Sequence, residues 1–462
     1  MVTAELRGES FLIVGYGREG RSVRQYLRAR FPSARIGLAD RQGFSPEEVF
    51  DADTELFSGD SYLSGASTFD TVIRSPGVRI QEIAPHLGAS THLTSPTNIF
   101  FAECPGKIIG VTGTKGKSTT SSLTTAILKH VFSDVRLVGN IGVPMLDYLQ
   151  DANKETCFVI ELSSYQLDDF RHSPHVSIVL NIVPEHLDYH GGFDSYCAAK
   201  LNIARNQRSD DALILNESFL LLSDMTRNFA GRRHTFREVD DENALVFVRN
   251  GVIFAKRESF ESIINVADLP VKGPGNLQNA LAAISCGIIL GASLDQIRKG
   301  IEGFVPLEHR LEFVAERAGI RFYNDSLSTI PEALTNALEA LGGEVQTVIA
   351  GGFDRGVDMA SLGPALAASK VKTLVLFPTT GEKIWEAAMS AAPAREYTRV
   401  DVQTMDEAVQ AAYDSTASGK TCVLSPASSS FSVFRDYRDR GEQFKDAIRR
   451  LGPSRLAAGG AE

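Results

Sequence analysis

The chain has 462 residues, which is long for one hydrophobic core and favours two to four domains. Apolar residues make up 43% and charged residues 23%, as in an ordinary globular protein. The net charge of −10 argues against a nucleic-acid partner, because there is no excess of Lys and Arg to neutralise phosphates. Five scattered cysteines without a CxxC pair argue against a zinc site or disulfide framework and favour a reducing cytoplasm. The N-terminus does not read as a signal peptide, and no apolar stretch reaches the roughly 18–20 residues of a membrane span.

The first residues show a strand–helix–strand pattern. A buried strand is predicted at 10–14, an amphipathic helix ends near residue 31, and a second strand covers 34–39. Gly15, Gly17 and Gly20 lie between the first strand and the helix, and Asp40 follows twenty residues after the last glycine. This spacing matches a dinucleotide-binding fingerprint, in which the acid contacts a ribose or base. The motif alone is not specific, and Asp40 can equally be a solvated acid at a strand end.

The stretch from Lys107 to Thr120 carries the most specific signal in the chain. An apolar strand leads into Gly113-Thr-Lys-Gly-Lys-Ser118, and a helical pattern follows. Glycines let the backbone approach closely, and the helix N-terminus favours anions, so this segment predicts a loop that holds phosphates. Lys117 is placed to reach terminal phosphates and Ser118 to ligate Mg²⁺. The first glycine of the usual spacing is Val111 here, and the alternative is a glycine-rich turn with incidental lysines.

Polar residues follow two further predicted strands, at 157–161 and 177–181. Because ligands bind at the carboxyl ends of parallel strands, Glu161 and Asn181 fall where chemistry is expected. Glu161 is a candidate Mg²⁺ ligand, but alone it is more simply a solvated acid. His186 is either a metal ligand or a loop histidine. Lys200 alone would be a surface lysine on a helix.

The remaining chain predicts a further α/β unit. A long helix is expected at 276–291, then strands at 321–324, 347–350, 373–377 and 421–424, with helices at about 331–342, 381–391, 405–417 and 432–451. We therefore expect an α/β protein of three domains. These are an N-terminal Rossmann-like domain (1–104), a central P-loop ATPase-type domain with a parallel sheet (105–306) and a C-terminal Rossmann-like domain (307–462).

Together these motifs resemble one family along essentially the whole chain. In order they are Gly113–Thr119, Gly139-Asn-Ile-Gly142, Glu161-Leu-Ser-Ser-Tyr-Gln-Leu167, Asn181-x-x-x-Glu-His-Leu-Asp188, Tyr196-x-x-Ala-Lys200, Gly273-x-x-Asn276-x-x-Asn279, His309-Arg310, Asp325-Ser326 and Leu424-Ser-Pro-Ala427. The chain is similar to the Mur ligases, ATP-dependent amide-forming enzymes of peptidoglycan precursor synthesis. Ser75-Pro-Gly77 and the segment from Leu424 to Gly441 resemble the glutamate-adding members.

The resemblance implies ATP and two Mg²⁺ ions, with UDP-N-acetylmuramoyl-L-alanine and glutamate as the other substrates. It also implies that the first domain binds a uridine nucleotide rather than NAD, and a cytoplasmic monomer is expected. The implied ATP-binding residues are Gly113, Thr114, Lys115, Gly116, Lys117, Ser118, Thr119, Asn276, His309 and Asp325. The implied substrate-binding residues are Gly15, Gly17, Gly20, Asp40, Asn140, Thr329, Arg355, Ser430, Phe431 and Tyr437.

For catalysis the resemblance implies Lys117, Glu161, His186 and Lys200. Ser118 and Glu161 would hold one Mg²⁺, and His186 and Lys200 would serve the second. Lys200 matches a position that is carbamylated in the family, which would convert a cation into a carboxylate-like ligand.

Several departures from the family pattern bear on the amino acid that is added. The D-glutamate enzymes usually have a lysine where this chain has Leu327, and Ile330 and Pro331 also differ. Arg355 replaces an expected lysine, Ser432 an aspartate and Gly275 a histidine. Lys and Arg are not equivalent at a carboxylate site. The resemblance favours D-glutamate, with L-glutamate as the alternative.

Other classes explain fewer of these motifs. An NAD-dependent oxidoreductase would use Gly15–Gly20 and Asp40, but it has no use for the phosphate loop. A catalytically inactive binding relative would not need Lys117, Glu161, His186 and Lys200 together. Folylpolyglutamate synthases, in the same superfamily, lack the N-terminal nucleotide-type domain.

Overall fold

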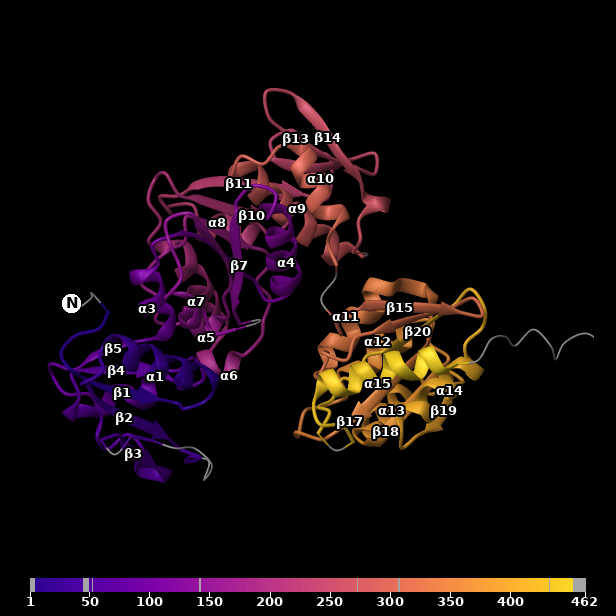
Figure 1. Ribbon diagram of the computed structural model, residues 1–462. Helices are drawn as coiled ribbons and strands as arrows, with labels where there is room; N and C mark the ends of the chain where they lie inside the picture. Colours follow the sequence, from indigo (N-terminus) through magenta and orange to yellow (C-terminus); the bar gives the residue numbers. More distant parts are fainter. Residues whose placement is uncertain are drawn as a thin grey trace, which may run out of the picture. The chain divides into compact units, whose positions relative to one another are not determined.

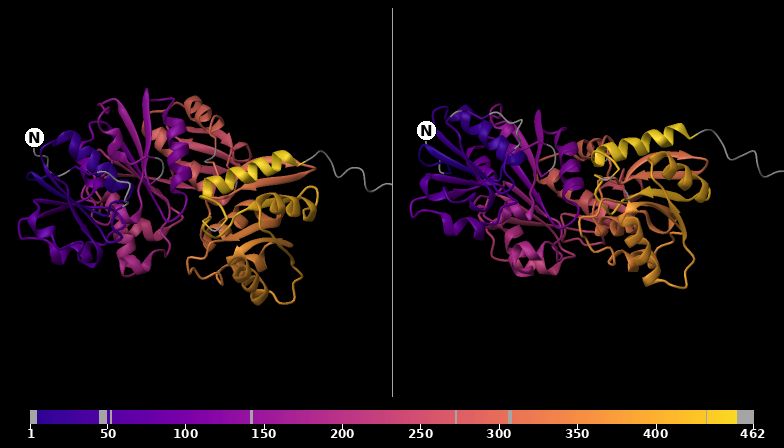
Figure 2. Two further views of the ribbon diagram at one scale, coloured as in Figure 1. Left: turned by 60° about the horizontal axis from the view of Figure 1, so that its bottom comes forward. Right: turned by 90° about the horizontal axis from the view of Figure 1, so that it is seen from below.

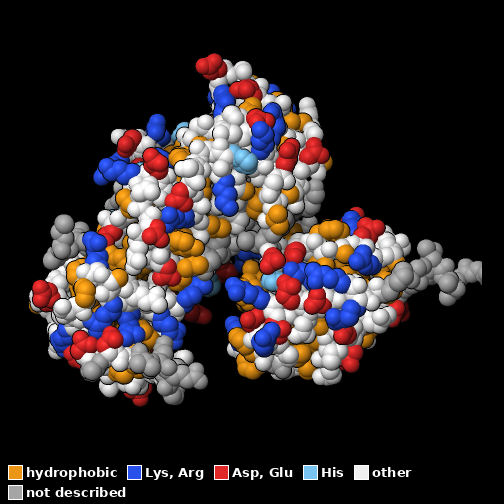
Figure 3. Space-filling view, viewed as in Figure 1, with side chains coloured by type: hydrophobic (Ala, Val, Ile, Leu, Met, Phe, Trp, Pro, Cys, Tyr) orange, Lys and Arg blue, Asp and Glu red, His pale blue; other side chains and the backbone are white. Residues whose placement is uncertain are grey.

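A computed structural model of the protein describes residues 5–44, 50–51, 53–140, 143–271, 273–305, 308–431 and 433–451. The chain forms two compact units. One contains residues 1–269 and 277–304, and the other contains 270–276 and 305–462. Three β-sheets are present, two in the first unit and one in the second (Figure 1). Acidic and basic side chains are intermingled on the face shown in Figure 3.

The N-terminal sheet has five parallel strands in the order β3-β2-β1-β4-β5. The predicted strand at 10–14 is confirmed, and its apolar residues are buried on both faces of the sheet. The strands are β1 (Ser10–Val14), β2 (Arg35–Asp40), β3 (Glu55–Ser58), β4 (Thr71–Arg74) and β5 (His92–Thr94). The helices are α1 (Arg18–Arg30), α2 (Ile80–Ile83) and α3 (Pro96–Glu103).

The central sheet has nine strands in the order β14-β13-β12-β11-β10-β9-β6-β8-β7. The strands are β6 (Lys107–Thr112), β7 (Asp134–Gly139), β8 (Thr156–Glu161), β9 (Val176–Val179), β10 (Ala212–Asn216), β11 (Arg232–Arg237), β12 (Val246–Arg249), β13 (Val252–Lys256) and β14 (Phe260–Asn265). The helices are α4 (Lys117–Leu128), α5 (Ser164–Leu167), α6 (Leu187–His190), α7 (Phe193–Arg205), α8 (Leu220–Met225), α9 (Pro274–Ile289) and α10 (Leu294–Glu302).

The expectation of a wholly parallel central sheet is wrong. From β7 to β12 the neighbours are parallel, but β12, β13 and β14 pair antiparallel. The reason lies in Asn250 and Gly251, which join β12 to β13 with φ values of 51° and 75°. Asn-Gly is the sequence best suited to a two-residue hairpin turn with both residues at positive φ. The sheet is therefore mixed, and its antiparallel strands lie far from the phosphate loop.

The first two sheets share one hydrophobic core. The core runs from Phe11 and Ile36 in the N-terminal sheet to Phe158 and Ile160 in the central one. Helix α3 connects them, because the ring of Phe100 lies 5.1 Å from that of Phe158. The two sheets therefore form one compact unit. The division into domains at residues 104 and 306 remains a prediction.

A buried ion pair also joins these sheets. Arg74, at the end of β4, is fully buried and lies 2.6 Å from Asp169, just after α5. Its guanidinium also donates to the carbonyls of Pro76 and Val78 in its own loop and of Tyr165 in α5. One side chain thus fixes the loop after β4 against the central sheet.

The second unit contains a six-stranded sheet in the order β15-β16-β20-β17-β18-β19, parallel except for β15. Helices α14 and α15 contribute to one core cluster with this sheet, and α11, α12 and α13 to another (Figure 2). The strands are β15 (Glu312–Arg317), β16 (Ile320–Asn324), β17 (Val345–Gly352), β18 (Thr373–Thr379), β19 (Thr398–Asp401) and β20 (Thr421–Leu424). The helices are α11 (Pro331–Leu341), α12 (Leu362–Ala368), α13 (Thr380–Ala391), α14 (Met405–Ser415) and α15 (Tyr437–Arg450).

The last helix begins later than residue 432, where the sequence placed it. Asp436 accepts hydrogen bonds from the backbone N–H groups of Arg438 and Asp439, so it caps the helix and fixes its start at Tyr437. An aspartate in this position satisfies N–H groups that have no partner inside the helix. The residues before Asp436 are therefore left in the loop that follows β20.

We expect Arg74→Met to destabilise the first unit by about 3–5 kcal/mol, because Asp169 would be left buried without its counter-ion. The matched control is Arg227→Met. Arg227 pairs with Asp224 at the surface, both side chains being about 70% exposed, and its loss should cost less than about 1 kcal/mol. Urea unfolding monitored by circular dichroism measures both variants. Equal effects of the two substitutions would contradict this role of Arg74.

Candidate active site

The phosphate-type loop lies between the central strand β6 and helix α4. Gly116 caps the helix at φ 87°, and a Cβ atom there would lie 2.1 Å from Oδ1 of Asn279. Only glycine fits this backbone and this close approach. Asn181 supports the loop from the neighbouring strand end. Its Oδ1 accepts from the N–H of Lys115 at 2.9 Å, and its carbonyl accepts from the N–H of Thr114 at 2.8 Å.

Two lysine ammonium groups converge on this loop. Nζ of Lys117 and Nζ of Lys200 both donate to the carbonyl of Gly113, at 3.1 and 2.8 Å. Lys200 is almost completely buried, which excludes the alternative of a surface lysine on a helix. Burial lowers the pKa of Lys200 well below its usual range, and the nearby Lys117 acts in the same direction. Two lysine side chains around one carbonyl supply donors that could also bind an anion.

Glu161 ends β8 and faces the same region. Its Oε1 accepts from the side-chain amide of Asn140 at 2.8 Å. Its Oε2 is buried and has no hydrogen-bond partner within the described residues. A buried carboxylate oxygen of this kind needs a cation or a donor. Glu161 and the buried Ser118 hydroxyl are the oxygen ligands that Mg²⁺ prefers, so this donor set fits the metal.

The second pair of expected metal ligands fits only in a modified form. Lys200 carries an amine, which is not a Mg²⁺ ligand in its protonated state, whereas a carbamate would supply oxygens. His186 precedes α6 in the left-handed region at φ 55°, and its side chain is 42% exposed. Burial lowers the pKa of His186, while Glu185 at 3.9 Å opposes that shift. Carbamylation of Lys200 remains a prediction.

A cleft of about 380 Å³ lies between the N-terminal and central sheets. It brings together four segments that are separate in sequence, two from the N-terminal sheet and two from the central one. They are the Gly15–Glu19 turn, the Ser75–Val78 turn, and a central-sheet set of Asn140, Ser163, Tyr165 and Gln166. Of the expected nucleotide-substrate residues, Gly15, Gly17 and Asn140 line this cleft. Gly20 instead allows close packing, because a Cβ there would lie 2.3 Å from the carbonyl oxygen of Gly15.

Asp40 has a structural role in this region. Its two oxygens accept from the backbone N–H groups of Tyr16, at 2.7 Å, and Gln42, at 2.9 Å. The carboxylate therefore fixes the glycine turn to the end of β2. These contacts agree with the alternative that Asp40 is an acid at a strand end. Contact between Asp40 and a nucleotide remains a prediction.

In the second unit, His309 and Asp325 lie beside one another. Leu327 N–H donates to the carbonyl of His309, and Leu311 N–H donates to Oδ1 of Asp325. The buried side chain of Arg440 holds the loop after β16, donating to both oxygens of Ser326. Asn276, the third expected adenosine contact, is the third residue of α9.

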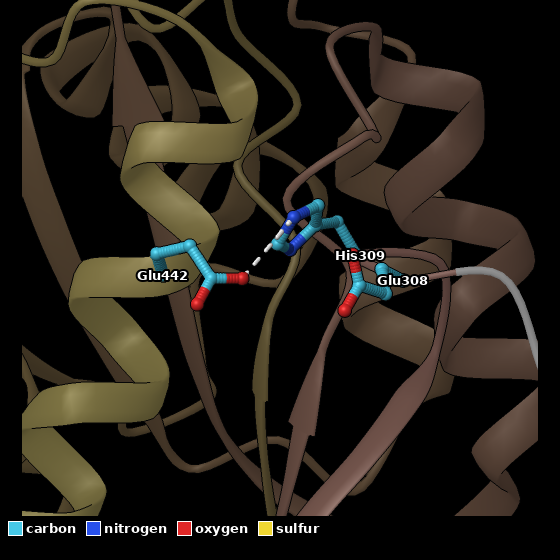
Figure 4. A group of neighbouring side chains, drawn as sticks. All are labelled: Glu308, His309 and Glu442. Carbon is cyan, nitrogen blue, oxygen red and sulfur yellow. Dashed lines mark ion pairs between the residues drawn. The ribbon is translucent and has the colours of Figure 1, made fainter. Parts of the chain in front are cut away.

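Glu308, His309 and Glu442 form a cluster that resembles a metal site (Figure 4). The Nε2 atom of His309 lies 3.6 Å from Oε1 of Glu442. However, Nζ of Lys445 lies 2.7 Å from Glu442 and 3.6 Å from Glu308. The ammonium group of Lys445 already provides the positive charge that a metal ion would bring to these carboxylates. We therefore interpret the group as an ion-pair network.

The expected glutamate-binding residues are only partly brought together. The guanidinium of Arg355 donates to Oγ of Ser429 at 2.9 Å and lies 5.8 Å from the ring of Phe431. Ser430, which stands between Ser429 and Phe431 in the sequence, is buried. Thr329 follows β16, and Tyr437 begins α15 with its carbonyl bound by Ser326. No described contact joins these two to Arg355.

Sequence reasoning placed Asn181 where chemistry is expected but gave it no specific role, and it gave none to Asn279, Tyr196 or Arg74. Asn181 supports the phosphate-type loop, Asn279 packs on it, and Tyr196 contacts Thr114 at 3.0 Å between hydroxyl oxygens. Arg74 fixes the substrate cleft. The family motifs given above contain Asn181, Asn279 and Tyr196, so the sequence could have indicated their roles. For Arg74 we find none, because an arginine at a strand end reads as exposed.

The comparisons with known proteins agree with this geometry. The Mur ligase middle domain matches residues 111–287, and the Mur ligase glutamate ligase domain matches residues 309–428. The chain is 35% identical, over 87% of each chain, to UDP-N-acetylmuramoylalanine–D-glutamate ligase of Acetivibrio thermocellus. It is 33% identical to the protein of that name from Acidobacterium capsulatum, over 96% of this chain and 97% of that one.

Solved structures show the same fold. The Thermotoga maritima MurF ligase in complex with ADP has a TM-score of 0.56 at 16% identity, with 96% of each chain covered. The UDP-N-acetylmuramate–alanine ligase MurC from the same organism has a TM-score of 0.57 at 19% identity, covering 96% of this chain and 99% of that one.

The chain belongs to the Mur ligase family. It is an ATP-dependent ligase that forms amide bonds, with the α/β fold of parallel and mixed sheets that this family has. Among the described residues, no helix is long and apolar enough to cross a membrane.

Asp325 gives the second unit a predictable pH dependence. Burial raises its pKa to about 6, although hydroxyl donors at Ser328 and Ser425 partly oppose this. The folded state therefore binds this proton more tightly than the unfolded state does. The free energy of unfolding falls as the pH rises from about 4 through 6. Asp325→Asn should remove that loss. The stability of the wild type relative to the variant should fall by about 2 kcal/mol between pH 4.5 and 7.5, measured by urea unfolding. Parallel pH profiles for the two proteins would contradict this.

Proposed function

We propose that the protein joins D-glutamate to UDP-N-acetylmuramoyl-L-alanine with hydrolysis of ATP to ADP, a step of peptidoglycan precursor synthesis. The observation that carries this is the similarity to ligases of that name, at 32–35% identity over 87–97% of this chain in the first four relatives. The geometry supports it, because the first unit contains both an anion-binding loop and a separate substrate cleft.

The proposed reaction has two steps. The alanyl carboxylate attacks the terminal phosphorus of ATP, giving an acyl phosphate and ADP. The amine of glutamate then attacks the acyl carbon, loses a proton, and the tetrahedral intermediate expels phosphate to leave an amide. Lys117 is the residue on the loop that can neutralise the transferring phosphoryl group.

Glu161 and Ser118 are proposed to hold one Mg²⁺, and His186 with carbamylated Lys200 a second. Bound Mg²⁺ would neutralise phosphate charge and orient the phosphates. The unpartnered Oε2 of Glu161 supports the first site. The burial of Lys200 and its lowered pKa support the second, because only a neutral amine reacts with carbon dioxide.

We assign the N-terminal sheet to a Rossmann-like domain that binds the uridine nucleotide, the central sheet to a P-loop ATPase-type domain, and the second unit to a C-terminal Rossmann-like domain. The 3-2-1-4-5 strand order and the cleft at Gly15 and Gly17 support the first assignment. The loop between β6 and α4 supports the second. The five-of-six parallel strand pattern in the second unit is consistent with the third.

We propose that the enzyme works as a cytoplasmic monomer. All five cysteines are free, as expected in a reducing compartment, and ATP with a uridine nucleotide are cytoplasmic substrates. Sedimentation of the purified chain as a species of 50.1 kDa would test the monomer.

The glutamate site leaves a second candidate, the same reaction with L-glutamate. Arg355 is the cation proposed to bind a glutamate carboxylate. Leu327 stands in the loop after β16 where the D-glutamate enzymes carry a lysine, and Ile330 and Pro331 begin α11 immediately after it. An apolar residue in place of a cation changes how the two carboxylates can be held.

The decisive measurement is phosphate release by purified enzyme with ATP, Mg²⁺ and UDP-N-acetylmuramoyl-L-alanine, offered D- or L-glutamate separately. We expect release that requires both the uridine nucleotide and D-glutamate. Release with L-glutamate alone would establish the second candidate. Phosphate release with neither isomer would remove the proposal altogether.

Lys200→Ala should lower turnover by at least about 10²-fold, the effect of removing one preorganised charged group. If the carbamate is the active form, added acetate or formate should restore part of the activity. Lys200→Met is the matched control, because its side chain fills the space that the carboxylate would need and should block rescue. Lys129→Ala, an exposed position at the end of α4, should remain fully active. Unchanged turnover in Lys200→Ala would exclude a metal-ligand role.

A further inference from the structure

A second cleft, of about 620 Å³, lies on the first unit. It is formed by the last turn of α1, the end of α3 and the residues after the short 3₁₀ helix η4 (Met145–Tyr148). Its volume lies in the range of pockets that bind organic ligands. None of the residues implied by the family pattern lines it.

Glu103 lines this cleft with a carboxylate that is only partly satisfied. Its side chain is 10% exposed. Oε2 accepts from the hydroxyl of Tyr26 and lies 3.5 Å from Nε of Arg30. Oε1 is buried and has no partner within the described part of the chain. Leaving a buried carboxylate oxygen unpaired is costly, so the site calls for a hydrogen-bond donor, best a cationic one.

The other residues of the cleft indicate which class of ligand could carry that donor. Arg30 lies directly beside Glu103, so an anion next to the donor would be favoured as well. Ammonium and carboxylate groups are this close together in a free α-amino acid. The remaining lining combines the apolar Ala29, Ala102, Pro105 and Leu149 with Tyr26 and Gln150. An apolar or aromatic side chain would cover that surface.

We propose that this cleft binds an α-amino acid with a large apolar side chain, its ammonium on Glu103 and its carboxylate on Arg30. The site is distinct from the nucleotide-type cleft. The two lie at opposite ends of α1, since Arg18 and Glu19 line one and Arg30 the other. Eleven residues of helix separate Glu19 from Arg30, which is roughly 16 Å along its axis.

Isothermal titration of the full-length protein with L-phenylalanine tests this, in the presence of saturating D- and L-glutamate so that the amino-acid substrate site is occupied. We expect a Kd of about 1 mM or tighter. Phenethylamine lacks the carboxylate and 3-phenylpropanoate lacks the ammonium, so each should bind at least about tenfold more weakly. No measurable heat with L-phenylalanine, or equal binding of all three compounds, would overturn the proposal.

Variants locate the binding. Glu103→Gln keeps an acceptor for Tyr26 but removes the charge, and should weaken L-phenylalanine binding at least about tenfold. Ala102→Trp fills the cleft without touching either charge and should abolish binding, so it serves if Glu103→Gln folds poorly. Glu155→Gln removes an exposed carboxylate elsewhere and should bind as the wild type does. Binding that survives both cleft variants would place the ligand elsewhere and refute the assignment.

Discussion

The position of β6 between β8 and β9 is the constraint on which the rest of the site depends. Parallel pairing puts Val111 opposite Glu161 and Thr112 opposite Val179, so three strands end at the same edge. The register of the sheet therefore places the loop after β6 beside the carboxylate of Glu161 and the amide of Asn181. A one-residue shift in either pairing would turn these groups to the other face of the sheet.

The surrounding structure fixes both lysine side chains at the loop. Lys117 is held at the first turn of α4, and Lys200 is held in α7 with its Nζ over the ring of Tyr196, 4.9 Å from the centroid. Both donate to the carbonyl of Gly113. These groups are therefore in position before any ligand binds, which is how electrostatic preorganisation operates.

The cleft at Gly15 and Gly17 depends on a different kind of interaction, the packing of two sheets into one unit. The rings of Phe100 and Phe158 supply the common core, and the pair of Arg74 with Asp169 fixes the direction of the loop after β4. A core of apolar side chains alone would allow the sheets to slide, because dispersion contacts are not directional. The buried ion pair has one geometry and therefore determines where Ser75–Val78 face the central sheet.

The sequence by itself determined the strand and turn before α4, because glycine at Gly116 and the apolar run at 107–112 act through short-range backbone chemistry. The cap at Asp436 is equally local, although the helix was predicted from about residue 432. The sequence also contained the Asn250-Gly251 hairpin signal, which was missed in favour of a parallel sheet. Tertiary structure alone decided the environments. The burial of Lys200 and of Arg74 is an example. Asp40 accepts hydrogen bonds from backbone N–H groups. The cleft at Glu103 is formed by three segments with no common motif. Burial and pairing depend on what distant residues bring alongside, and no local pattern encodes that.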